Sequence, residues 1–181
     1  MEMIPHTLLL QGKFISLRPL RSEEFRLFYK WATHSDATSY WYQSKPGDEI
    51  PSYMVFRHEW PSYYFLDDFP EKGRCFGIVL NEQLIGQVNY NEIQQADQSV
   101  SLDILLSNKN NMNKGYGSDA LKTLTTYLFK TFPLKSCSAE IFGENTRAVQ
   151  AFQKAGFQIQ QEFERGGKSW VLLVMNSPLS I

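Results

Sequence analysis

The stretch NMNKGYGS, residues 111–118, lies between an expected strand and an expected helix. Its two glycines let the backbone turn tightly and come close to a ligand. The free N–H groups of the first helical turn point at one place, where the helix dipole favours an anion such as a pyrophosphate. Lys114 adds a positive charge nearby. The stretch indicates a phosphate-binding turn, and the alternative is a plain strand-to-helix connection.

Two better-known phosphate motifs do not fit this turn. The pattern G-x-x-x-x-G-K-[ST] of P-loops does not occur around Gly115 and Gly117. The dinucleotide pattern G-x-G-x-x-G requires a third glycine where this chain has Ala120. If the turn binds phosphate, it therefore belongs to another class.

The chain before the turn predicts strands. Residues 14–19 alternate apolar and polar side chains and end at a proline, and residues 75–80 and 84–90 form an expected hairpin. In residues 99–106, Val100, Leu102, Ile104 and Leu106 share one face, which leaves Asp103 on the other face with Ser99, Ser101 and Leu105. Ser22 is expected to cap a first helix that continues past Phe25.

The chain after the turn predicts alternating helices and strands. One helix runs to about Lys130, a strand covers residues 136–142, and Asn145 caps a second helix that Gly156 ends. Two last strands, residues 157–165 and 168–175, flank Gly166-Gly167, a strong hairpin signal. The whole order is that of one mixed α/β domain.

Residues 34–70 are harder to interpret. They hold four prolines and many aromatic residues, among them the run Tyr40-Trp41-Tyr42, and a short helix is expected only from Ile50 to about Glu59. Long loops in compact domains are often functional, so this segment is expected either to line a binding cleft or to pack over the core.

The composition excludes several classes of protein. The 181 residues suit one domain, and a net charge of −1 gives no basic excess for binding nucleic acid broadly. No apolar run is long enough to span a membrane, and the first residues lack the features of a signal peptide. Cys75 and Cys137 have no metal-type spacing, the three histidines suggest no metal site, and a reducing compartment, the cytoplasm, is expected.

Several motifs together resemble the GNAT superfamily of acyl-CoA-dependent N-acetyltransferases. That family has the loop Gln/Arg-x-x-Gly-x-Gly/Ala, and further on Asn-x-x-Ala-x-x-x-Tyr-x-x-x-Gly-Phe. This chain has Gly115-x-Gly117, then Asn145-Thr146-Arg147-Ala148 and Lys154-Ala155-Gly156-Phe157. The resemblance covers roughly residues 13–176 and leaves residues 1–12 as an N-terminal extension.

The resemblance implies a fold and a subfamily. The expected fold is a mixed, mostly antiparallel sheet of about six to seven strands flanked by helices, in which the fourth strand (99–106) splays from the fifth (136–142). The run Ser101-Leu102-Asp103-Ile104 and the run from Asn113 to Leu121 look closest to aminoglycoside 6′-N-acetyltransferases. The phrase Ser16-Leu17-Arg18-Pro19-Leu20 also occurs in enzymes that acetylate ribosomal protein N-termini.

The resemblance also implies site residues for acetyl-CoA as cosubstrate. Asp103 is the candidate general base, because an alkylamine must lose a proton before it attacks a thioester. Backbone groups of Leu105 and Leu106 are expected to pair with the pantetheine arm, one of them as an oxyanion donor. The remaining expected contacts to the cosubstrate are Met112, Asn113, Lys114, Gly115, Tyr116, Gly117, Ser118, Asn145, Arg147, Ala148 and Phe152.

Two positions depart from the family pattern. Met112 stands at the Gln/Arg position, so phosphate recognition is expected to rely on backbone N–H groups and Lys114. Phe152 stands where the family often has a tyrosine that serves as general acid, and phenylalanine cannot protonate a leaving thiolate. Another group or water protonates the thiolate, or it leaves unassisted.

The expected reaction is acetyl transfer from acetyl-CoA to a primary amine by direct attack. The expected acceptor is a small cationic amine, an aminoglycoside or a polyamine, and Tyr40-Trp41-Tyr42 is expected to wall its cleft. A protein N-terminus is the alternative acceptor, and a catalytically silent acyl-CoA sensor is the alternative function. A homodimer is possible by analogy with similar proteins. Carboxylates that are candidates for the acceptor cleft are Asp67, Asp68, Glu71, Glu92 and Asp97.

Overall fold

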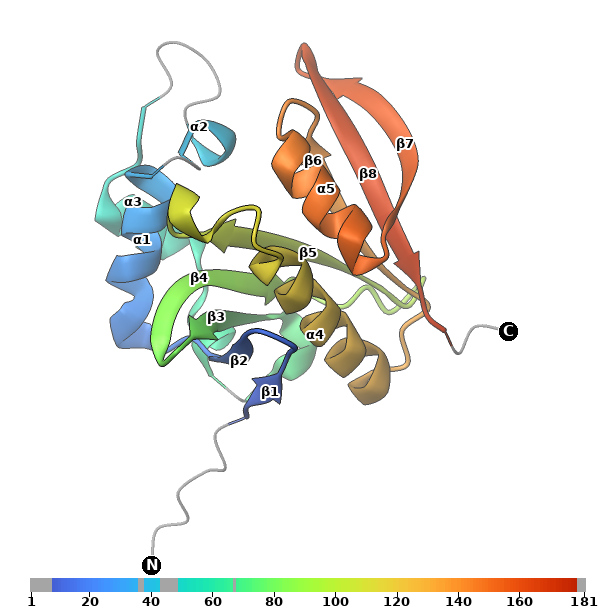
Figure 1. Cartoon of the computed structure of the whole chain (residues 1–181), viewed down its shortest axis with the longest axis horizontal. Helices are drawn as coiled ribbons and strands as arrows, with labels where there is room; N and C mark the ends of the chain where they lie inside the picture. The colour runs from blue at the N-terminus through green and yellow to red at the C-terminus, as the bar shows by residue number, and fades with distance from the viewer. Residues whose placement is uncertain (1–7, 36–37, 43–48, 67, 179–181) are drawn as a thin grey trace, which may run out of the picture.

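The computed structural model describes residues 8–35, 38–42, 49–66 and 68–178. Its centre is one eight-stranded sheet with the strand order β1-β2-β3-β4-β5-β6-β8-β7 (Figure 1). Neighbouring strands are antiparallel except for β5 and β6, which are parallel. The strands are β1 (Leu10–Gln11), β2 (Ser16–Pro19), β3 (Arg74–Leu80), β4 (Gln83–Tyr90), β5 (Ser99–Leu106), β6 (Ser136–Phe142), β7 (Gln158–Arg165) and β8 (Lys168–Asn176).

Helices cover both faces of this sheet. On one face α4 and α5 pack against residues of β2 to β6 and β8 in the larger core, which includes Leu102, Leu124 and Phe152. On the other face α1 and α3 pack over Cys75 and Leu105 in a second core rich in aromatic side chains. Figure 1 shows α1, α2 and α3 gathered at one side of the molecule. The helices are α1 (Phe25–Thr33), α2 (Thr38–Trp41), α3 (Tyr53–Glu59), α4 (Tyr116–Thr131) and α5 (Thr146–Ala155).

The two expected hairpins are confirmed. Asn81 and Glu82 join β3 to β4 with φ angles of 48° and 66°, and Gly166 and Gly167 join β7 to β8 with φ angles of 60° and 71°. Two consecutive residues with positive φ form the turn whose twist matches that of the flanking strands. Asparagine and glycine tolerate this conformation best, which is why the sequence signals were readable.

The start of the chain differs from the prediction. The first strand begins at Ser16 rather than residue 14, because the amides of residues 13–15 turn toward the carboxylate of Asp119. The sheet also extends into the expected N-terminal extension, since Leu10 and Gln11 pair with β2 as an eighth strand. Ser22 does not cap a helix: it opens a 3-10 helix, Ser22–Glu24, and α1 follows from Phe25.

The segment 34–70 contains more regular structure than the sequence suggested. The expected helix at 50–59 is present as α3, and the Ser52 hydroxyl accepts a hydrogen bond from the Val55 N–H at 3.3 Å. The short α2 and a 3-10 helix, Ser62–Phe65, were not predicted. Phe56 of α3 is buried against Phe25 and Phe28 of α1.

The expected splay is confirmed and sets the position of the site. β5 pairs with β6 only through residues 99–101 and 136–138, at the beginning of both strands. β5 then remains paired with β4 as far as Leu106, while β6 pairs with β8 along its whole length. The two halves of the sheet therefore diverge beyond Ser101, as the ribbons of β5 and β6 do in Figure 1.

Candidate active site

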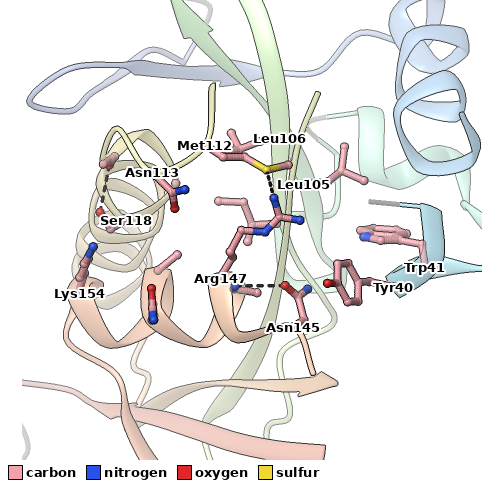
Figure 2. A pocket seen from close by; sticks show the side chains of 16 residues that line it. Tyr40, Trp41, Leu105, Leu106, Met112, Asn113, Ser118, Asn145, Arg147 and Lys154 are labelled. Carbon is pink, nitrogen blue, oxygen red and sulfur yellow. Dashed lines mark hydrogen bonds between the residues drawn. The ribbon is translucent and has the colours of Figure 1, made fainter. Parts of the chain in front are cut away.

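Two pockets adjoin where β5 leaves β6. The first pocket lies between the start of α4, the start of α5 and the end of β5, and Figure 2 shows its lining. Its lining residues are Tyr40, Trp41, Ile104, Leu105, Leu106, Met112, Asn113, Gly115, Gly117, Ser118, Asn145, Arg147, Ala148, Gln150, Ala151 and Lys154.

The turn before α4 is shaped to hold an anion. Gly115 has a φ of 86°, a left-handed conformation in which a side chain would be strained, and it caps α4. The first hydrogen bond within the helix runs from the Asp119 N–H to the Gly115 carbonyl, at 2.9 Å. The amides of residues 116–118 come before this bond and begin the helix, where backbone N–H groups have no carbonyl of the helix to donate to.

Gly117 gives a ligand close access to this backbone. A Cβ built at Gly117 would lie 3.7 Å from Ile104 Cδ1, 3.8 Å from Leu106 Cδ1 and 3.9 Å from Ala151 Cβ, all ordinary contacts. The protein itself therefore does not require a glycine here for space. Because Gly117 also lines the pocket, its missing side chain leaves room for a ligand instead.

Two cationic side chains from α5 line the first pocket. The Arg147 Nη1 lies 2.8 Å from the sulfur of Met112, so the guanidinium stands beside the residue that departs from the family pattern (Figure 2). Lys154 lines the same pocket about two turns further along α5. The positive charge that Met112 lacks is thus supplied by the neighbouring helix.

Asn145 has the capping role that the sequence predicted. Its Oδ1 accepts a hydrogen bond from the Ala148 N–H at 3.2 Å, which fixes the start of α5 against the pocket. Beyond Ser101, the edge of β5 that faces β6 has no strand partner in the described chain. Leu105 and Leu106 lie on this open stretch and line the pocket, as expected of residues whose backbone pairs with an extended ligand.

Two expected contacts, Lys114 and Tyr116, line neither pocket, and a third, Phe152, lines only the second pocket. Lys114 is exposed, and neither its side chain nor that of Tyr116 lines the first pocket. Tyr116 instead packs against the larger core and meets the ring of Phe14, with 6.5 Å between the ring centroids. Left-handed φ angles at Asn113 and Gly115 turn the chain sharply on both sides of Lys114, and this turn leaves its side chain in solvent.

The second pocket continues from the first, on the side of α2 and the β7–β8 hairpin. It shares five residues with the first pocket and adds a carboxylate floor and aromatic walls. Its lining residues are Tyr40, Trp41, Trp60, Leu102, Asp103, Ile104, Glu140, Ile141, Phe142, Asn145, Ala148, Phe152 and Trp170. None of these lining residues, which all lie in the described chain, carries a positive charge.

Asp103 is held in the second pocket by a polar network on β4. Its Oδ2 accepts hydrogen bonds from Asn91 Nδ2 at 3.1 Å and from Asn89 Nδ2 at 3.3 Å. The Tyr64 hydroxyl donates to Asn91 Oδ1 at 2.9 Å and so orients that amide. The carboxylate is therefore positioned by fixed amide groups and does not point freely into solvent.

The environment of Asp103 favours its protonated form. Burial raises the pKa of Asp103 above the usual aspartate value, and the hydrogen bonds from Asn91 and Asn89 oppose this rise only in part. A carboxylate with a raised pKa is a stronger base than one in water. Asp103 thus combines a fixed position with the basicity that proton abstraction from an ammonium group requires.

The second carboxylate of this pocket is Glu140, which sequence reasoning did not identify. It lies on β6, and its Oε2 forms a salt bridge with Arg165 Nη1 at 2.7 Å. Alternation along residues 136–142 places Glu140 on the face opposite the buried Cys137 and Ala139, and this was the available signal. Since Arg165 partly neutralises Glu140, Asp103 is the main negative charge of the pocket.

The carboxylates expected in the acceptor cleft are not there. Asp68, Glu71, Glu92 and Asp97 line neither pocket, and Asp67 lies outside the described residues. The physical reason is their place in the chain. Asp97 precedes β5 and accepts a hydrogen bond from the Ser99 hydroxyl at 2.8 Å, whereas the pockets open at the other end of the strand.

The aromatic run is divided between pocket and core. Tyr40 and Trp41 line both pockets, as predicted. Tyr42 lines neither: its ring packs against Phe56, and its hydroxyl donates to Glu59 at 3.3 Å. Along a helical turn, neighbouring side chains point in different directions, so one residue of the three faces away.

Phe152 closes the inner end of the second pocket. Its side chain is 2% exposed and packs edge-on against Phe157, with 4.9 Å between the ring centroids. The ring thus occupies the expected position but supplies no proton. Among the described residues there is no cluster of three or more potential metal ligands, and no helix is long and apolar enough to cross a membrane.

Comparison with known proteins supports this geometry. The sequence profile of the "Acetyltransferase (GNAT) domain" matches residues 15–158. The chain belongs to the GNAT acetyltransferases. The match spans every element that forms the two pockets except β8, which contributes Trp170.

Two curated GNAT relatives act on amines, according to their names. The aminoglycoside N(6′)-acetyltransferase type 1 of Klebsiella pneumoniae is 22% identical over 155 residues, covering 81% of this chain and 75% of its own. The spermidine N(1)-acetyltransferase of Escherichia coli K12 is 23% identical over 148 residues, covering 82% and 75%.

Solved GNAT structures share the fold. An aminoglycoside acetyltransferase in complex with coenzyme A and kanamycin superposes with a TM-score of 0.71 at 20% identity, covering 90% of this chain and 94% of its own. The spermidine N-acetyltransferase of Vibrio cholerae, in complex with CoA and spermine, gives 0.72 at 19% identity, covering 90% and 95%. These likenesses establish the mixed α/β GNAT architecture of the chain.

Proposed function

We propose that this protein transfers the acetyl group of acetyl-CoA to the primary amine of a small cationic acceptor. The observation that carries the proposal is the junction of two pockets of opposite character at the splay of β5 and β6. One pocket holds a helix N-terminus and two cationic side chains, and the other holds a half-buried carboxylate among aromatic rings. A phosphate-bearing thioester and a cationic amine are complementary to this pair.

The first pocket fits the cosubstrate on chemical grounds. The amides of residues 116–118, Arg147 and Lys154 would bind its phosphates, because each offers an N–H donor or a positive charge to an anion. The open edge of β5 at Leu105 and Leu106 would pair with the amides of the pantetheine arm. Acetyl-CoA bound in this way supplies the activated acetyl group.

Asp103 is proposed as the general base. An alkylamine is mostly protonated near neutral pH and cannot attack a carbonyl in that form. Asp103 would attract the ammonium group and take its proton, directly or through one water molecule. The lone pair of the amine nitrogen would then attack the thioester carbonyl, whose oxygen a backbone N–H of Leu105 or Leu106 would stabilise.

The lining of the second pocket supports a slender cationic acceptor with few hydroxyl groups. The rings of Trp41, Trp60, Phe142 and Trp170 line the pocket, and aromatic rings attract cations, as Lys168 over Phe142 and Arg165 over Trp170 illustrate. Of the two carboxylates that line the pocket, Asp103 is the one without a salt bridge to a described residue. An acceptor with one ammonium at Asp103 and a slender body along the rings fits this lining. Spermidine matches that description better than an aminoglycoside, whose many hydroxyl groups need polar partners.

We also propose a single acetyltransferase domain over residues 13–176 and a cytoplasmic location. Both buried cysteines are free thiols, as is usual for a reducing compartment.

The test measures CoA release from acetyl-CoA with a panel of amines, alongside a titration of acetyl-CoA binding. The panel contains spermidine, tyramine, kanamycin and short peptides. Turnover of a small amine with measurable acetyl-CoA binding supports the proposal. Turnover of peptides alone moves the acceptor to a protein N-terminus, and tight binding without turnover of any amine indicates a sensor.

A further inference from the structure

The leaving thiolate has no proton donor at the position where the family pattern puts one. Phe152 fills that position with a buried hydrocarbon ring. A group that protonates the sulfur must lie where the cosubstrate and the acceptor meet, because the sulfur is the atom that parts from the transferred acetyl group. The candidates for this group are therefore the residues that line both pockets.

The two pockets share five lining residues. Ile104 and Ala148 are hydrocarbon, and Asn145 and Trp41 carry only amide and indole N–H groups, which do not ionise near neutral pH. Tyr40 alone among the five has a hydroxyl whose proton can be given up and regained. The five residues are Tyr40, Trp41, Ile104, Asn145 and Ala148.

The setting of Tyr40 leaves its hydroxyl available. Tyr40 lies on α2, across the pocket from α5, and its ring packs against Phe142 with 6.4 Å between the ring centroids. In Figure 2 its oxygen points toward Asn145, at the capped start of α5. No described residue forms a hydrogen bond with this hydroxyl, in contrast to that of Tyr42 two residues later, which bonds to Glu59.

We propose that Tyr40 is the general acid of the acetyl transfer, in place of the missing hydroxyl at Phe152. The inference rests on the proposed function. Asp103 first takes one proton of the ammonium group and passes it to water, so that the amine attacks in its neutral form. The amine nitrogen then forms its bond to the acetyl carbon and gives a second proton to Asp103, while the carbon–sulfur bond breaks. The sulfur takes the electron pair of that bond and the proton of the Tyr40 hydroxyl. Asp103 later returns a proton to water, and tyrosinate regains one, so charge and atoms balance.

The first test compares Tyr40→Phe with Tyr42→Phe, which removes the same atom from a neighbouring tyrosine outside both pockets. Tyr40→Phe is expected to lower kcat about 10²-fold, within the range usual for a general acid, with little change in KM. Tyr42→Phe is expected to keep kcat within about twofold of the wild type, because it changes neither pocket. Equal kcat values for the two variants would overturn the proposal.

The second test does not depend on turnover. A hydroxyl that donates to a thiolate stabilises the charged form and lowers the pKa of the thiol. The thiol of bound CoA, followed by the ultraviolet absorbance of the thiolate, is therefore expected to titrate at higher pH in Tyr40→Phe than in the wild type or Tyr42→Phe. Identical titrations in all three proteins count against Tyr40. If the wild type acetylates no amine, the proposed function fails, and this titration still decides whether Tyr40 faces the sulfur.

Discussion

The two pockets are built in different ways. The first pocket is formed mainly by one continuous turn, by the first turns of α4 and α5, and by the open edge of β5. The second pocket takes its side chains from α2, β5, β6, α5 and β8 and from Trp60 after α3. Under the proposed function, backbone geometry therefore forms most of the site for acetyl-CoA. Side chains from distant segments form the site for the acceptor amine.

This difference has a chemical counterpart. Under the proposed function, backbone N–H groups and two cations of the first pocket would bind the phosphates, so that binding there would be spread over many donors. In the second pocket the proposed proton transfer depends on one half-buried carboxylate, Asp103. Substitution of a single side chain should therefore cause a large loss of activity in the second pocket and only a partial loss of acetyl-CoA binding in the first.

The largest effect is expected for Asp103→Asn. Loss of the base should lower turnover about 10²- to 10⁴-fold, the usual contribution of general base catalysis. Acetyl-CoA affinity, measured by calorimetric titration, should stay the same because Asp103 does not line the first pocket. Asp97→Asn is the matched control, since Asp97 also lies by β5 but lines neither pocket. If the variant lost acetyl-CoA binding in parallel with turnover, the two pockets would not have the separate roles proposed for them.

Gly117→Ala should produce the next largest effect and confine it to the first pocket. A Cβ there makes only ordinary contacts with the protein but takes space from the ligand, so the Kd for acetyl-CoA should rise about tenfold, or about 1.4 kcal/mol. Thermal stability should not fall, because alanine favours a helix over glycine.

Gly156→Ala provides the reverse control. Its φ of 111° and a Met175 Cε only 2.9 Å from the added Cβ predict lower stability with unchanged acetyl-CoA affinity. Unchanged affinity in Gly117→Ala as well would show that the ligand does not approach this backbone.

Arg147→Ala tests whether α5 replaces the charge that Met112 lacks. Loss of a charged hydrogen-bond donor at an exposed phosphate site is expected to weaken acetyl-CoA binding about three- to tenfold. The deficit should shrink in high salt because screening weakens the charge in both proteins. Lys30→Ala on α1 removes the same charge far from both pockets and should leave binding unchanged. A loss in Arg147→Ala that does not respond to salt would argue for a packing role.

Asp103→Asn also predicts a pH-dependent gain in stability. Burial raises the pKa of Asp103, so the folded protein holds this proton more tightly than the unfolded chain. As pH rises through the raised pKa, the wild type loses stability, and the asparagine variant lacks this loss. In denaturant titrations, the free energy of unfolding of the variant relative to that of the wild type should increase from acidic to neutral pH. A gap that narrows with rising pH would mean that Asp103 is stabilised as the anion.

The smallest effect is expected for Lys114→Ala. The sequence placed this charge at the phosphates, but the structure leaves it exposed and outside the pocket. Acetyl-CoA affinity should change less than about twofold, as is usual for a solvated surface charge. A loss of acetyl-CoA affinity as large as that of Arg147→Ala would show that Lys114 binds the phosphates, as the sequence predicted.

What the sequence predicted well is local. β6 and its bounds, the Asn145 cap, the Gly156 end of α5 and the two hairpins each depend on residues next to one another in the chain. The turn at Gly115 and Gly117 was likewise predicted from its own residues. The splay and the placement of Leu105 and Leu106 came from the family resemblance, and the structure shows the splay and places both leucines in the first pocket.

What the sequence did not predict depends on contacts between distant segments. Trp60, Glu140 and Trp170 meet only because β6 follows β8 away from β5 and α2 packs across the gap. The carboxylates that were wrongly predicted to line the acceptor cleft show the same limit, because the local sequence does not indicate which loops lie next to the second pocket. Arg147 was named as a contact, but its proximity to Met112 joins two positions 35 residues apart.

Asp119 determines how many N-terminal residues can be removed without loss of stability. Its buried carboxylate in the first turn of α4 accepts N–H groups of Lys13, Phe14 and Ile15, at 3.0, 2.7 and 3.1 Å. Proteolytic trimming up to Gly12 would remove an edge strand and leave these donors in place. Trimming past Ile15 would leave an uncompensated negative charge in the core, which costs several kcal/mol. The chain before Lys13 can therefore be removed without exposing the Asp119 carboxylate, whereas Lys13, Phe14 and Ile15 are required to neutralise the start of α4.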